Sequence, residues 1–102
     1  MNDINLQLNP ISSIEELKAF LKEFFNGKGV EIFLFGSRAK GNFRPTSDID
    51  LAFLSEDDIS YKISLLKEIL ENSNLVQKVD IIELKKAPQL KSVVDSDGIR
   101  WI

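Results

Sequence analysis

The chain has 102 residues, of which 43% are apolar and 28% charged, and its formal charge is −3. This size and balance predict one soluble globular domain over residues 1–102 and argue against a disordered chain. Histidine and cysteine are both absent, which excludes a serine–histidine–aspartate triad, thiol chemistry and disulfides. Any catalysis must therefore use carboxylates, hydroxyls, backbone amides and hard cations.

The N-terminal residues 1–11 have no basic segment followed by an apolar core. We therefore expect a loose N-terminal segment rather than a secretory signal. No apolar run in the sequence reaches the length of a membrane span, so we expect a cytoplasmic protein with no membrane partner. The acidic balance also argues against strong nucleic-acid binding.

Two long helices are predicted from the spacing of apolar residues. The first begins at Ser12 or Ser13, where Glu15 or Glu16 can complete a capping box. Its apolar residues recur at helical spacing: Ile14, Leu17, Phe20, Leu21, Phe24 and Phe25. Gly27 and Gly29 can end it. The second lies within residues 55–74, and acidic residues at 56–58 suit its N-terminal end. Its stripe is Ile59, Ile63, Leu66 and Leu70.

Short runs of β-branched and aromatic residues predict strands at 30–35, 49–54 and 76–84. A helical turn is expected at 38–41, a short helix from Pro88, and a last extended piece at 99–102. Helices thus lie between most strands. This order predicts a small α/β (α+β) domain in two layers, with a mixed sheet of about four strands and helices packed on it.

Two aspartates, Asp48 and Asp50, stand where an apolar strand begins. Residues two apart in a strand point to the same face, and their Cα atoms lie about 6–7 Å apart. Converging carboxylates about 4 Å apart repel by about 4 kcal/mol when the effective dielectric is near 20. The pair therefore needs a cation or a proton, and oxygen-only ligands favour Mg²⁺ over zinc.

A third acid, Asp80, lies in the predicted strand 76–84. If that strand lies beside 49–54, Asp80 can join Asp48 and Asp50. Three carboxylates can then share two Mg²⁺ ions about 3.5–4 Å apart. Glu83 is the competing candidate, but alternation along a strand places it on the other face.

Gly36 and Ser37 end the first predicted strand and supply the other half of a phosphate site. Glycine lets the chain turn sharply and lets a ligand approach the main chain, and free amides at the start of a short helix favour anions. Arg38, Lys40 and Arg44 bring cationic side chains to the same loop, and which of them face inward is left open. A triphosphate held here with two Mg²⁺ would expose its α-phosphorus to in-line attack.

Each of these features is commonplace alone. A glycine–serine pair is usually a turn, a D-x-D usually binds nothing, and basic loop residues are usually solvated. Their conjunction is rare: a strand, Gly36-Ser37, ten residues, Asp48 and Asp50 in a second strand, and Asp80 in a third. By contrast, the sole tyrosine and the sole tryptophan, Tyr61 and Trp101, are expected on the surface and in packing.

The combination resembles the nucleotidyltransferase superfamily related to DNA polymerase β, and more narrowly its minimal nucleotidyltransferase (MNT) branch. The resemblance is carried by residues 36–41, 44–45, 47–51 and Asp80. It implies that Asp48 and Asp50 hold both metals and that Asp80 binds the catalytic metal and helps to activate the acceptor. The residues implied in nucleotide binding are Gly36, Ser37, Arg38, Lys40, Arg44 and Ser47.

The resemblance also implies transfer of a nucleoside monophosphate, with ATP as donor, to an acceptor hydroxyl with release of pyrophosphate. Prokaryotic members of this branch are commonly paired with a HEPN-domain ribonuclease toxin, and as antitoxins they adenylylate one of its tyrosines. The chain ends soon after its last strand, so we expect a homo- or hetero-oligomeric partner to complete the site. The alternatives are a non-catalytic binding antitoxin or regulatory subunit, and transfer to a small molecule or an RNA end.

Overall fold

The computed structural model describes residues 10–26 and 29–102. Its elements are α2 (Ile14–Phe24), β1 (Glu31–Phe35), α3 (Ser37–Lys40), β2 (Ile49–Leu54), α4 (Ser60–Glu71), β3 (Val79–Glu83), the 3₁₀ helix η1 (Pro88–Leu90), α5 (Lys91–Asp97) and β4 (Ile99–Arg100). Among these residues no helix has the length and apolarity that crossing a bilayer requires. The predicted loose segment lies outside the described residues over 1–9, and Ile11 near its end is buried in the core.

The strands form one mixed sheet in the order β3-β2-β1-β4. β1 pairs antiparallel with both β2 and β4, whereas β2 pairs parallel with β3. The register places Asp50 between Phe35 of β1 and Asp80 of β3. The predicted fold class, a mixed four-stranded sheet with packed helices, is confirmed.

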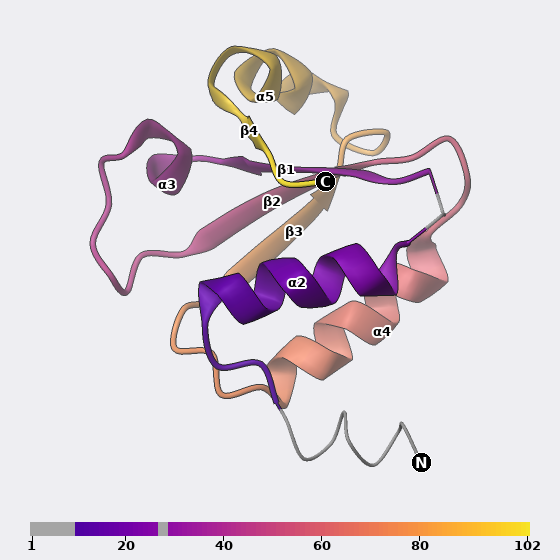
Figure 1. Cartoon of the computed structure of the whole chain (residues 1–102). Coiled ribbons are helices and arrows are strands. Elements are labelled where there is room, and N and C mark those ends of the chain that lie inside the picture. The colour runs from indigo at the N-terminus through magenta and orange to yellow at the C-terminus, as the bar shows by residue number, and fades with distance from the viewer. Residues whose placement is uncertain (1–9, 27–28) are drawn as a thin grey trace.

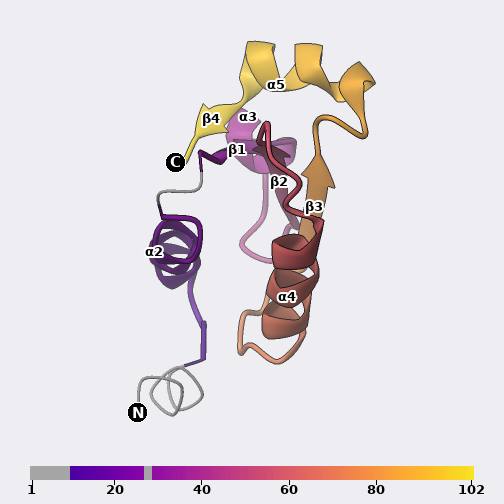
Figure 2. The ribbon, with the colours of Figure 1, turned by 90° about the vertical axis from the view of Figure 1, so that its right-hand side faces the viewer.

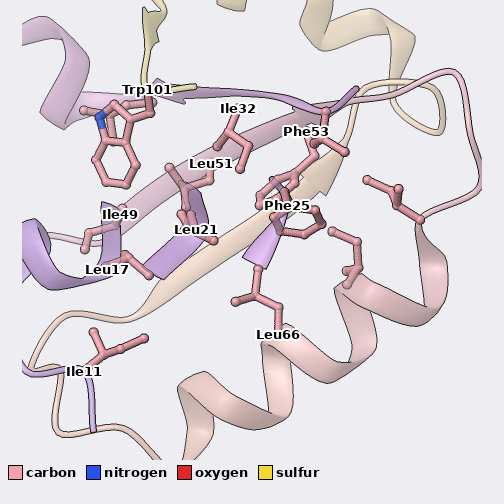
Figure 3. Close-up of a cluster of buried hydrophobic side chains, with 14 residues drawn as sticks. Ile11, Leu17, Leu21, Phe25, Ile32, Ile49, Leu51, Phe53, Leu66 and Trp101 are labelled. Atoms are coloured by element: carbon pink, nitrogen blue, oxygen red, sulfur yellow. The ribbon is translucent and has the colours of Figure 1, made fainter. Parts of the chain in front are cut away.

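One face of the sheet is covered by α2 and α4, which lie side by side beneath it (Figure 1). Side chains from both helices meet the inward-facing residues of β1 and β2 in one core (Figure 3). Each fully buried aliphatic or phenylalanine side chain here contributes about 1.5–3 kcal/mol. The largest of them are Phe53, Leu17, Leu21, Ile32, Ile49, Leu51 and Leu66.

The helix boundaries follow local hydrogen bonds. Ser13 caps α2 because its Oγ accepts from the amide of Glu16 at 3.1 Å, and the Glu16 carboxylate accepts from Ser12. Before α4, the Asp58 carboxylate accepts from the Ser60 amide at 2.9 Å. The predicted caps and acidic N-terminus are therefore present, with the acids preceding the first turn of α4.

The other face of the sheet is covered in part by η1 and α5, which Figures 1 and 2 place away from α2 and α4. A second apolar cluster lies there, formed by Ala52, Leu84 and Val94 with half-buried neighbours from β1 and β3. Trp101 packs into the main core, and Tyr61 is 75% exposed. Both agree with their predicted structural roles.

Candidate active site

The parallel pairing of β2 with β3 sets Asp50 directly beside Asp80. Paired residues of neighbouring strands point to the same face, so the side chains of Asp50 and Asp80 lie side by side. Asp48 is exposed and immediately precedes β2. The structure thus brings Asp50 and Asp80 together, with Asp48 at the end of the same strand.

The electrostatics of this pair differ from those of an ordinary surface acid. Partial burial raises the pKa of Asp50, and the negative charges of Asp80 and Asp48 and a hydrogen bond to Asp80 raise it further. A partly buried carboxylate beside other negative charges holds its proton more readily than one in water. An exposed lysine, Lys78, also lies 3.5 Å from an Asp80 oxygen, and a pair so exposed adds little stability.

Asp50 and Asp80 are the assembled part of this acidic site. Over residues 10–26 and 29–102 no three histidine, cysteine, aspartate or glutamate side chains form a ready metal-binding group. The donor set nevertheless suits a hard divalent cation, because neighbouring carboxylate oxygens are the ligands that Mg²⁺ prefers. Glu83, the competing acid, faces the other side of the sheet and pairs with Lys86 at 3.1 Å.

Gly36 directly follows β1, which flanks β2 on the side opposite β3, and it lies against the Asp50 side chain. Its backbone has φ 77° and ψ −155°, a region that essentially only glycine occupies. A Cβ at this position would overlap the Asp50 carboxylate, with Cγ of Asp50 at 3.2 Å. The glycine therefore has two physical reasons to be there: the turn itself and the close approach of the Asp50 side chain.

Arg38 belongs to α3 and is directed at the loop that follows. Its Nε donates to the carbonyl of Ser47 at 3.1 Å, and its Nη2 donates to that of Pro45 at 2.8 Å. The guanidinium also lies over the Phe43 ring, 4.6 Å from its centroid. Two of its three nitrogens thus anchor the loop.

Of the other predicted nucleotide-binding residues, Ser37 and Lys40 belong to α3, and Arg44 and Ser47 belong to the loop after it. Ser37, Lys40 and Arg44 are exposed, whereas Ser47 is half-buried and its Oγ accepts from the Arg44 amide at 2.9 Å. Sequence reasoning missed Gln77, whose side chain donates to the carbonyl of Pro45 at 2.8 Å. An isolated glutamine before a strand carries no signal that could have identified it.

The fold and this site define a nucleotidyltransferase domain: acids on two neighbouring strands, facing a glycine–serine turn that opens a short helix. Residues 15–100 match the family described as "Polymerase beta, Nucleotidyltransferase". Because the match spans most of the chain, the protein belongs to this family.

Two relatives carry provisional names as protein adenylyltransferases. One, MJ0604 of Methanocaldococcus jannaschii, is 35% identical over 63 residues, which are 62% of this chain and 63% of that protein. The other, MntA of Haemophilus influenzae, is 38% identical over 53 residues, which are 51% of this chain and 46% of that protein. The chain thus matches less than two thirds of the length of either relative.

Solved structures of toxin–antitoxin complexes have a similar fold. A toxin–antitoxin with AMP-PNP matches with a TM-score of 0.60 at 24% identity, over 83% of this chain and 72% of that chain. A mutant of the toxin–antitoxin MntA–HpeT matches with a TM-score of 0.59 at 26% identity, over 81% of this chain and 69% of that chain.

Proposed function

We propose that this domain transfers AMP from ATP to a hydroxyl, that of a tyrosine, on a partner toxin of the HEPN type, and so acts as an antitoxin. The observation that carries the proposal is the Asp50–Asp80 pair facing Gly36. The names of the two relatives and the toxin–antitoxin likeness at 26% identity support the acceptor class.

Each residue of the site has a role in this reaction. Asp48, Asp50 and Asp80 are the residues that would hold two Mg²⁺ ions, which neutralise triphosphate charge and stabilise the attacking and leaving oxygens when bound. Gly36 has no Cβ that would displace the Asp50 carboxylate, and it lets the chain turn into α3. Ser37 contributes its hydroxyl and amide to the triphosphate, and the exposed Lys40 and Arg44 supply positive charge.

The chemical step is a displacement at the α-phosphorus of ATP. The acceptor oxygen forms a bond to that phosphorus while the bond to the bridging oxygen of the β-phosphate breaks, and pyrophosphate leaves. In this proposal Asp80 orients the acceptor hydroxyl and takes its proton. Its side chain is 43% exposed and lies beside Asp50, which supports that role. The protein partner provides the rest of the acceptor site.

The test is labelling of the partner with ATP that carries the label on its α-phosphate, in the presence of Mg²⁺. Replacing Asp48 and Asp50 with Asn should abolish labelling, because the metal ligands lose their charge. Asp57→Asn is the matched control, since Asp57 is an exposed acid beyond the C-terminal end of β2. Equal labelling by the double variant would refute the site, and partner inhibition without any labelling would favour a purely binding antitoxin.

A further inference from the structure

We propose that Gln77 and Arg38 are positioning residues that align the three segments of the acidic site through one atom, the carbonyl oxygen of Pro45. The inference rests on the proposed function and deepens it. Neither residue needs to touch the substrate in this role. It also gives Arg38 a function different from the nucleotide contact that the sequence resemblance implied.

Both side chains donate to the same acceptor. Arg38 Nη2 lies 2.8 Å from the Pro45 oxygen, and Gln77 Nε2 lies 2.8 Å from it. A carbonyl oxygen has two lone pairs, so these two donors use its full capacity. The bond from Arg38 is charge-assisted and is therefore the stronger of the two.

The shared oxygen joins segments that are distant in sequence. Arg38 directly follows Gly36 and Ser37, and Pro45 lies three residues before Asp48. Gln77 lies three residues before Asp80. The segments that carry the proposed triphosphate-binding and metal-binding residues are therefore held close to the Pro45 oxygen. This oxygen lies at the end of the sheet where β2 and β3 begin.

A neighbouring backbone contact completes the junction. The amide of Ile49 donates to the carbonyl of Lys78 at 2.8 Å. Ile49 lies between Asp48 and Asp50, and Lys78 directly follows Gln77. Without the Gln77 side chain, this backbone bond would be the one hydrogen bond left between the segments that lead into β2 and β3 within residues 29–102. Asp80 would then be less well fixed relative to Asp50, and small misplacements of reacting groups can cost up to about 10²-fold in rate.

The test compares Gln77→Met with Gln89→Met, a control on the exposed η1 helix. Both substitutions are neutral, so neither changes the charge of the site. Mn²⁺ affinity is measured on the protein without nucleotide, and the hydrogen exchange rate is measured at the Ile49 amide. Gln77→Met should weaken Mn²⁺ binding about 3- to 10-fold, as expected for one lost hydrogen bond, and should speed Ile49 exchange. Gln89→Met should change neither.

Arg38→Lys is the second variant, because it keeps the charge and loses the planar pair of donors. A positioning role predicts lower kcat and weaker Mn²⁺ binding with the KM for ATP changed less than about twofold. A rise in that KM with unchanged Mn²⁺ affinity would show that Arg38 binds the triphosphate and would overturn its positioning role.

The two proposals fail differently. If Gln77→Met matched its control in Mn²⁺ affinity and in Ile49 exchange, the positioning role would be overturned even with an active wild-type protein. If the wild-type protein labelled no partner but Gln77→Met still weakened Mn²⁺ binding, the positioning role would stand and the proposed reaction would fall.

Discussion

Replacing Gly36 with Ala perturbs the backbone and the acidic pair together. The backbone at φ 77° and ψ −155° costs a non-glycine residue about 1–3 kcal/mol. The added Cβ would also overlap the Asp50 carboxylate, and turning that side chain off its preferred rotamer costs about 0.5–1.5 kcal/mol. We therefore expect Gly36→Ala to lower the free energy of unfolding by about 1.5–4.5 kcal/mol.

Gly41→Ala is the matched control for this change. Gly41 has the same φ of 77°, but a Cβ there would meet no atom within 4 Å. Its substitution should cost only the left-handed backbone, about 1–2 kcal/mol. Urea unfolding without metal gives both values, and partner labelling gives activity. Gly36→Ala should lose far more activity than Gly41→Ala, because the added methyl group forces the Asp50 carboxylate out of its present position.

A double-mutant cycle isolates the contact with Asp50. Asp50→Ala removes the overlapping carboxylate and leaves a Cβ that lies 3.5 Å from the added methyl group, an ordinary contact. In that background Gly36→Ala should be less costly by about 0.5–1.5 kcal/mol, the rotamer share of the loss. An unchanged cost in both backgrounds would show that the carboxylate does not lie against Gly36, and the geometry of the site would be wrong.

Three further outcomes follow from the same contacts. The pKa of Asp50 is raised in the folded protein, so ionisation of Asp50 lowers the free energy of unfolding. Asp50→Asn should therefore be more stable than wild type by a difference that grows as the pH rises from about 4 through the raised pKa. Unfolding without metal at a series of pH values measures this difference. A flat difference would contradict that shift. Lys78→Met should change the free energy of unfolding by less than about 1 kcal/mol, because its pair with Asp80 is exposed. It should retain labelling within about threefold, because Lys78 itself is no metal ligand; loss of labelling would make Lys78 part of the site. Ser13→Ala should cost about 1 kcal/mol in urea unfolding through loss of the cap that the Glu16 amide uses, and an unchanged midpoint would mean that the cap adds nothing.

Most of the fold was predictable because its signals are local. The apolar stripe of α2 and the capping serine define that helix within a few residues. The run of residues 49–54 is β2 without any shift. The burial of Ile11 was not predictable, because it depends on the loop after α4, where the Asn74 amide donates to the Ile11 carbonyl at 2.8 Å. No property of residues 1–11 alone reveals that contact.

The features of the site were likewise predictable only where their signals are local in sequence. Alternation along a strand was enough to separate Asp80 from Glu83, and the structure places them on opposite faces. The direction of the Arg38 side chain was not predictable, because the sequence pattern of basic residues near a loop is the same whether they face a ligand or a main-chain carbonyl. Its partners are main-chain oxygens of Pro45 and Ser47, which any residue type supplies and which therefore leave no trace in the sequence.

The placement of the acids on the sheet explains how one face serves both packing and chemistry. Along β2 this face carries Asp50 first and then Ala52, and along β3 it carries Asp80 and then Ile82. η1 and α5 cover the apolar ends of both strands, while the acidic ends stay half-buried. That degree of burial is enough to raise the pKa of Asp50 and still leaves the carboxylates open to a cation and a nucleotide. A helix extended over the acidic end would stabilise the sheet and close the site.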